Sequence, residues 1–183
     1  MLELNDIARL RKQLGLTQPE LAQLSGVSQS LIAKLEAGKI EPSYTKVKSI
    51  IDTLTKLRMR NSKRAGDISS ANIHRVQADK IVQEAADIMH NEAISQLPVF
   101  ESGRVVGSIT EKTILKILSE TRSPTDAFKK RISDVMDDPF PTVSDETPVE
   151  LLYQLLTFFE AVLVTERNVV KGIVTKTDLL KIG

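Results

Sequence analysis

The C-terminal two thirds of the sequence contain an internal repeat, and this feature constrains the fold more than any other. Two copies lie between residues 74 and 182. Matching positions are 67 residues apart at Val76 and Val143 but 65 apart at Gly107 and Gly172, so the second copy is two residues shorter. Neither copy is long enough to bury a core by itself, so we expect the two to pack against each other.

Each copy predicts the order strand, helix, strand, turn, strand, helix. The short apolar runs LPVF, from Leu97, and AVLVT, from Ala161, predict buried strands. The dipeptides SG at 102–103 and RN at 167–168 predict the turns of the hairpins that follow. The pattern therefore predicts an α/β fold for this part of the chain.

The first third of the sequence predicts only helices. Within it, TQPELAQLSGVSQSLIAKLEAG (residues 17–38) predicts two short helices joined by a tight turn at Gly26. Thr17 and Glu20 form a capping-box pattern before the first of them, and Ser28 is placed to cap the second. Apolar spacing predicts one helix before this segment and at least one after it, giving four or five in all.

These patterns predict three domains and a linker. An all-α domain is expected at residues 1–60, followed by two α/β domains at 71–122 and 130–183. The stretch at 61–70 is rich in Lys and Arg and lacks an apolar face. A solvated linker and an arm that contacts phosphate both fit that composition.

Composition excludes several classes of function. Cysteine is absent and the two histidines are far apart, so we expect no disulfide and no metal site. The acidic residues around Asp137 and Asp145 lack calcium-loop spacing and predict a solvated loop. The N-terminus is charged throughout and no apolar run is long enough to span a membrane. No nucleophile, base and orienting group form a catalytic set, so we expect a cytoplasmic protein that is not an enzyme.

Charge is distributed unevenly along the chain. The net charge is +1, yet residues 1–66 hold 12 Lys and Arg against 6 Asp and Glu. The remainder of the chain is acidic. A basic first third carried by an acidic body indicates a nucleic-acid-binding domain attached to a second module.

Residues 5–57 resemble the helix-turn-helix domain of the Cro and phage-repressor family, through RLRKQLGLTQPELAQLSGVSQSLIAKLEAGKIEPS. The resemblance implies that the third helix enters the major groove of a double-stranded DNA operator, while the second crosses the phosphate backbone. It places Gln18 at phosphate and four further residues at bases and flanking phosphates: Ser28, Gln29, Ser30 and Lys34. It also implies a structural ion pair between Arg11 and Glu36. A structural helical hairpin with a solvated polar face is the alternative interpretation.

Residues 67–183 resemble a tandem pair of CBS domains, through ISDVMDDPFPTVSDETPVEL, LPVFESGRVVGSIT and GIVTKTDLL. Such a pair commonly holds adenine nucleotides, with the Thr and Asp of a Gly-x-x-Thr-x-x-Asp signature at phosphate and ribose. The second copy matches this signature with Thr175 and Asp178. The first copy keeps Thr110 but has Thr113 in place of the Asp. The backbone at Thr142 and Ala161 matches the stretches that line the base pocket.

Thr175 and Asp178 also fit a purely structural role as cap and first turn of the last helix. Taken together, the two resemblances predict a homodimeric, sequence-specific transcriptional regulator. Its CBS pair would sense a regulatory ligand such as AMP, ATP or S-adenosylmethionine, without requiring any cofactor. The alternative is a ligand-independent repressor, or an antitoxin-like protein, whose CBS pair serves only for dimerisation.

Overall fold

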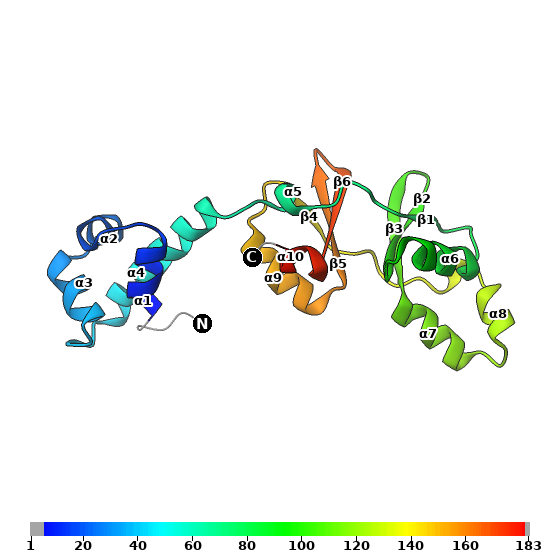
Figure 1. Cartoon of the computed structure of the whole chain (residues 1–183), viewed down its shortest axis with the longest axis horizontal. Helices are drawn as coiled ribbons and strands as arrows, with labels where there is room; N and C mark the ends of the chain where they lie inside the picture. The colour runs from blue at the N-terminus through cyan, green and yellow to red at the C-terminus, as the bar shows by residue number, and fades with distance from the viewer. Residues whose placement is uncertain (1–5, 182–183) are drawn as a thin grey trace. The chain divides into compact units, whose positions relative to one another are not determined.

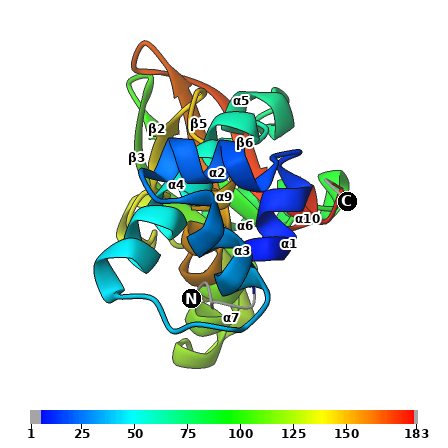
Figure 2. The same cartoon turned by 90° about the vertical axis from the view of Figure 1, so that its left-hand side faces the viewer.

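The computed structural model describes residues 6–181, which divide after Ser62 into two compact units (Figure 1). Every regular element of the N-terminal unit is a helix, and α1, α2 and α3 are seen together in Figure 2. The helices are α1 (Asp6–Gln13), α2 (Gln18–Ser25), α3 (Gln29–Glu36) and α4 (Tyr44–Asn61). Their apolar faces meet in one core, formed by Ile7, Leu10, Leu21, Ala22, Ile32, Leu35, Ile50 and Leu54.

The ends of α2 and α3 are fixed by the caps that the sequence predicts. The Thr17 hydroxyl accepts a hydrogen bond from the Glu20 amide, and the Glu20 carboxylate accepts one from the Thr17 amide. Gly26 ends α2 at φ 67°, in the left-handed region that glycine enters without steric cost. Ser28 caps α3 by accepting from the Leu31 amide at 3.3 Å. The turn between the two helices is therefore set by local chemistry.

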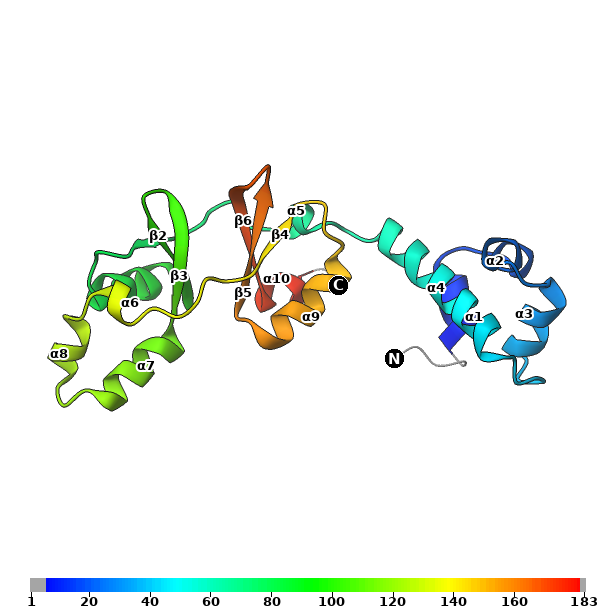
Figure 3. The ribbon, with the colours of Figure 1, turned by 180° about the vertical axis from the view of Figure 1, so that it is seen from behind.

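The C-terminal unit contains two three-stranded sheets, one from each repeat (Figure 3). In each sheet the first strand is parallel and the third antiparallel to the central strand. The first repeat comprises β1 (Val76–Gln77), α6 (Val82–Glu92), β2 (Gln96–Glu101), β3 (Arg104–Thr110) and α7 (Glu111–Glu120). The second comprises β4 (Thr142–Ser144), α9 (Val149–Phe158), β5 (Ala161–Glu166), β6 (Val169–Thr175) and α10 (Lys176–Leu180). Helix α8 (Pro124–Phe128) and a 3₁₀ turn (Ile132–Asp134) connect them.

The two residues missing from the second copy are lost between its first helix and its central strand. Three residues separate α6 from β2, beginning with Ala93 at φ 52°, whereas two separate the shorter α9 from β5. After that point the registers agree, since Val99 pairs with Gly107 and Val164 with Gly172. The predicted repeat and its strand order are confirmed.

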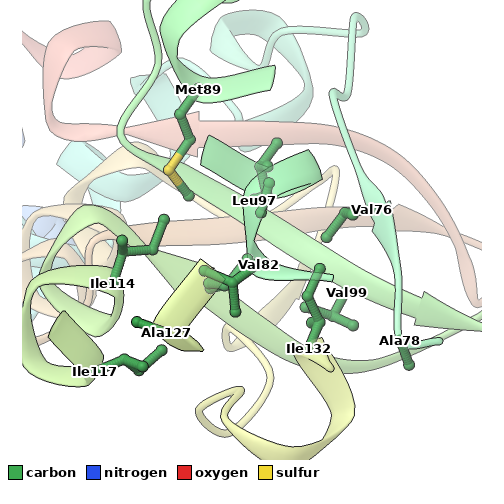
Figure 4. Packing of buried hydrophobic residues seen from close by; sticks show 12 residues of the cluster. Val76, Ala78, Val82, Met89, Leu97, Val99, Ile114, Ile117, Ala127 and Ile132 are labelled. Atoms are coloured by element: carbon green, nitrogen blue, oxygen red, sulfur yellow. The ribbon is translucent and has the colours of Figure 1, made fainter. Parts of the chain in front are cut away.

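Each repeat buries its own apolar cluster, and a smaller cluster joins them. The largest covers one face of the first sheet beneath α6, α7 and α8, where Val82, Leu97 and Val99 are fully buried (Figure 4). The joining cluster consists of Phe140, Ala161 and Leu163, against which Val105 of the first repeat packs. Each repeat therefore has an apolar cluster of its own, contrary to the expectation that neither could bury one, while the joining cluster packs the two against each other as expected.

Residues 63–70 pack on the second repeat, although they precede the first in the chain. This stretch was predicted as part of a linker, but it holds a short helix, α5 (Ala65–Ile68), in which Ala65 is fully buried. Ser70 exchanges two backbone hydrogen bonds with Ile173 of β6, at 2.9 and 3.0 Å. Asp137 does the same with Ser108 of β3. The segment that leads into the first repeat therefore packs on the second repeat, and the segment that leads into the second packs on the first. We call these two stretches the added segments.

The added segments cross their sheets at the glycines of the repeat. A Cβ atom at Gly107 would approach Met136 and the Asp137 carbonyl to less than 3.0 Å, and one at Gly172 would approach Ser69 as closely. Real Cβ atoms essentially never show such contacts. The two glycines are therefore required by close backbone crossing.

Candidate functional site

The start of α3 carries a cluster of exposed polar side chains. Ser28, Gln29 and Ser30 are all exposed, and the Ser28 and Ser30 hydroxyls lie 3.3 Å apart. The Gln29 Nε2 atom donates to Gln18 Oε1 across the turn at 3.1 Å. Lys34 is exposed one turn further along α3. The structure thus brings Gln18 and Gln29 into direct contact and leaves the other three side chains open to solvent.

A buried ion pair lies behind this cluster. Arg11 of α1 donates from Nε to Glu36 Oε1 at 2.7 Å and from Nη2 to Oε2 at 3.0 Å. The two side chains are only 10% and 8% exposed. The hydrogen bond from Arg11 lowers the pKa of Glu36 although burial opposes that shift, so the carboxylate stays ionised. The predicted structural ion pair is confirmed.

Hydrogen bonds connect this ion pair to the exposed cluster. Gln18 Nε2 donates to Glu36 Oε2 at 2.9 Å, while its Oε1 accepts from Gln29. The contact with Glu36 fixes which end of the Gln18 amide faces α3. Sequence reasoning named Gln18 and Gln29 separately but missed their link, since it depends on how α2 packs against α3.

In the second repeat, Thr175 and Asp178 meet at the start of α10. The Asp178 Oδ2 atom accepts from both the amide and the hydroxyl of Thr175, each at 2.9 Å. Both residues line a cavity of about 520 Å³. Lys176 and Glu160 form an ion pair of 2.8 Å on its wall. The carboxylate is therefore held by one oxygen at the edge of a polar cavity.

Other lining residues of this cavity come from parts of the chain that the sequence analysis does not select. They include Ser70 and His74, which precede β1, and Ala93–Gln96 of the first repeat. Thr142 lines a different cavity, and Ala161 is fully buried in the cluster that joins the repeats. The structure thus places Thr142 at a different cavity, whereas the backbone of Ala161 lies beside the cavity of Asp178, since its neighbour Glu160 and its strand partner Thr175 both line that cavity. Aligning the two copies could have indicated Gln96 as a lining residue, because Gln96 occupies the position in the first copy that Ala161 occupies in the second.

The first repeat arranges the equivalent position differently. Thr110 caps α7, and its amide and hydroxyl contact the hydroxyl of Thr113 at 3.2 and 2.8 Å. The Thr113 hydroxyl in turn donates to a carboxylate oxygen of Asp137. Asp137 is exposed and lies outside the helices and strands, as the prediction of a solvated loop requires, but this loop is bound to β3 through backbone hydrogen bonds to Ser108. The Asp137 carboxylate binds the side chain that replaces the signature Asp, because the added segment brings it to β3.

Neither a metal centre nor a membrane span is found in the described part of the chain. Among residues 6–181, His, Asp and Glu side chains form no group of three that could hold a metal ion. No helix in that range is both long and apolar enough to cross a membrane.

The family comparisons agree with this geometry. The helix-turn-helix family profile matches residues 7–56, and the CBS domain profile matches residues 65–120 and 132–183. The chain therefore belongs to the CBS-domain family, with a helix-turn-helix domain preceding a tandem CBS pair.

Curated relatives match the CBS pair and are much longer proteins. An inosine-5'-monophosphate dehydrogenase of Methanocaldococcus jannaschii is 29% identical over 120 residues, covering 65% of this chain and 23% of the relative. A zinc metalloprotease of the same organism is 30% identical over 118 residues, covering 64% and 31%. The chain spans less than a third of either relative.

Solved structures match the same region. A CBS-domain protein of Agrobacterium tumefaciens has a TM-score of 0.60 at 21% identity, covering 66% of this chain and 92% of that one. A CBS pair solved with 5'-methylthioadenosine and S-adenosyl-L-methionine has a TM-score of 0.58 at 26% identity, covering 66% and 95%. The α/β fold predicted for the C-terminal part is confirmed.

Proposed function

We propose that this protein is a DNA-binding transcriptional regulator whose CBS pair binds an adenosine-based ligand in the cavity of Asp178. It would act as a homodimer in the cytoplasm, where its operator lies, and would have no catalytic activity of its own. The proposal of ligand binding rests on the Asp178 carboxylate, which is held through Oδ2 at the edge of a polar cavity of about 520 Å³.

The DNA half rests on the exposed start of α3. Gln29 offers an amide that can bond adenine through two atoms, and Lys34 offers a cation for guanine or phosphate. Ser28 and Ser30 add hydroxyls that can bond either bases or phosphates. In a dimer, two such helices would read half-sites about 34 Å apart, or a multiple of that distance.

The ligand half rests on the chemistry of the second repeat. An ionised carboxylate can accept hydrogen bonds from both hydroxyls of a ribose, and Asp178 Oδ1 contacts only the Lys181 ammonium, at 3.5 Å, among the hydrogen bonds of the described residues. Lys176 supplies a cation for a phosphate, carboxylate or similar acceptor. The relative solved with 5'-methylthioadenosine and S-adenosyl-L-methionine supports adenosyl compounds, with AMP and ATP as further candidates.

Ligand and operator would be coupled only if the ligand binds one dimer arrangement better than another. The quantity to be shifted is the spacing between the two α3 helices of the dimer. Ligand-independent assembly is the competing function, and exposed apolar side chains favour it. Phe158 and Leu180 are 83% and 84% exposed. A dimer that buries them would leave the protein a constitutive repressor or an antitoxin-like partner.

The test begins with a thermal-shift panel of AMP, ATP, S-adenosylmethionine and 5'-methylthioadenosine on the purified protein. We expect one compound to raise the melting temperature, and Asp178→Ala to weaken its binding by about tenfold to a hundredfold, the range for a charged hydrogen bond. Operator sequences selected from random DNA then give the affinity with and without that compound. If no compound raises the melting temperature, the CBS pair serves only for assembly. If operator affinity is equal with and without the compound, ligand binding and operator binding are not coupled.

The DNA half has its own controls. Gln29→Ala combined with Lys34→Ala should abolish selective operator binding, since both side chains are exposed and their loss leaves the core intact. Lys39→Ala, which removes an exposed cation beyond the end of α3, should keep sequence selectivity. Unchanged operator binding by the double variant would refute α3 as the recognition helix.

A further inference from the structure

A second cavity, of about 450 Å³, lies at the turn ends of the β2–β3 and β5–β6 hairpins. It shares no lining residue with the cavity of Asp178. Its walls come from both repeats, with Arg104 on the first hairpin and Asn168 on the second. Apolar residues of both hairpins form much of the remaining lining, together with the polar side chains of Thr142 and Thr165. This is therefore a separate site within the C-terminal unit.

The charge of this cavity is entirely positive. Arg75 and Arg104 line it, and no Asp or Glu does. Neither guanidinium forms an ion pair with a carboxylate of residues 6–181. Two arginines beside one apolar cavity without a neutralising acid attract an anion from solution.

Arg75 is already oriented for this purpose. Its guanidinium lies over the Phe100 ring, 5.2 Å from the centroid. A guanidinium held over an aromatic ring still carries N–H groups that can donate to an anion. The contact with Phe100 restricts the Arg75 side chain before any ligand binds, so binding costs less side-chain entropy.

The repeat shows that this charge is not a general feature of the fold. Arg75 corresponds to Thr142 in the second copy, and Arg104 corresponds to Val169. Both cations therefore stand on the wall contributed by the first repeat, while Thr142, Thr165 and Asn168 face the cavity from the second. One wall suits an anionic group, and the other offers hydroxyl and amide groups beside valines.

We infer that this cavity binds a small phosphate monoester with an apolar body. A phosphate carries up to two negative charges and three terminal oxygens, so both guanidiniums can donate to it at once. The apolar body would rest on Phe100, Val105 and Val170. The inference does not depend on the adenosine-binding function, because the two cavities have no residue in common.

Calorimetric titration of the full chain with phenyl phosphate, inorganic phosphate and phenol tests this inference. We expect phenyl phosphate to bind most tightly, inorganic phosphate more weakly, and phenol not at all. Arg75→Gln and Arg104→Gln should each weaken phenyl phosphate binding about tenfold or more, the effect of losing a charged hydrogen bond. Both side chains are exposed, so the variants should keep the melting temperature of the wild type.

Two further variants make the result specific. Arg122→Gln removes an exposed arginine outside the cavity and should leave phenyl phosphate binding unchanged. Asp178→Ala should also leave it unchanged, which separates this site from the proposed nucleotide site. The inference is overturned if phenyl phosphate does not bind, if both Arg→Gln variants bind it as the wild type does, or if Arg122→Gln loses as much affinity as they do.

Discussion

Arg11 and Glu36 join the first helix of the chain to the end of the third through two parallel hydrogen bonds, of 2.7 and 3.0 Å. Arg11 also donates from Nη1 to the Leu16 carbonyl at 2.5 Å, so the loop before α2 is tied to the same guanidinium. Because both side chains are largely buried and shielded from water, each charge is stabilised mainly by its partner. The ion pair thus adds a direct polar link between α1, the loop before α2 and the end of α3 to the apolar core that these helices share.

Removing one partner of this pair should destabilise the helical unit strongly. We expect Arg11→Ala to lower the free energy of unfolding by about 3–5 kcal/mol, since Glu36 would remain charged and buried without its partner. Urea unfolding of the full chain, followed by circular dichroism, measures the change. Arg9→Ala is the matched control, because Arg9 is 66% exposed and its one ion pair among residues 6–181 is with Asp6, one turn away. Its loss should cost less than about 1 kcal/mol, and an equal cost for both variants would contradict the role of burial.

The same pair predicts how stability depends on pH. The folded-state pKa of Glu36 is lowered from its ordinary value of 4.5, chiefly by the hydrogen bond from Arg11. Below pH 4.5 the unfolded chain therefore binds a proton that the folded chain does not, and stability falls as the pH drops toward the folded pKa. Urea midpoints measured from about pH 7 down to about pH 3 should decline less steeply in Glu36→Gln than in the wild type. Parallel curves would show that Glu36 does not contribute.

Features that depend on neighbours in the sequence could be predicted from it. The Thr17 capping box and the Gly26 turn are local, since each needs only a few adjacent residues. The strands and turns of the repeat follow from apolar runs and turn residues, and comparing two copies supports each assignment. The Arg11–Glu36 pair was accessible only through resemblance to a family, because 25 residues separate the partners.

Contacts that arise from chain crossing could not be predicted. Nothing in the composition of residues 63–70 indicates that they join the second repeat. That placement depends on backbone hydrogen bonds between Ser70 and Ile173. The link from Thr113 to Asp137 has the same origin. Each joins segments that are far apart in the sequence, and no local pattern indicates that they meet.

The glycines at these crossings should tolerate no side chain. Gly107→Ala would push a methyl group into Met136 and the Asp137 carbonyl, and we expect a loss of about 1–3 kcal/mol in unfolding free energy. Adding Met136→Ala removes the nearest side-chain atoms but not the carbonyl, so the glycine substitution should then cost less. A double-mutant cycle by urea unfolding measures this coupling. Strict additivity of the two substitutions would show that Met136 does not oppose the methyl group.

The carboxylate near the signature Thr stands at different positions in the two repeats, which predicts that only one repeat of each chain binds the adenosyl ligand. In the second repeat, Asp178 presents its carboxylate at the cavity, and Ser70 stands on the added segment. In the first, the carboxylate belongs to Asp137 on the added segment, and Thr113 stands at the signature position. Exchanging the two residue types, by combining Thr113→Asp with Asp137→Ser, gives the first repeat the arrangement of the second.

With the adenosyl compound found by thermal shift, and with Arg75→Gln and Arg104→Gln present throughout so that the separate phosphate site does not contribute, titration calorimetry should give one site per chain without the exchange and two with it. Asp137→Ser alone is the control, because it removes the partner of Thr113 without supplying a signature carboxylate, and it should keep one site. Thr113→Asp alone would set two carboxylates side by side, so we expect it to destabilise the fold without adding a site. One site with the exchange, at an unchanged melting temperature, would show that the carboxylate position does not decide which repeat binds. Two sites without the exchange would show that Asp137 serves the first repeat as Asp178 serves the second.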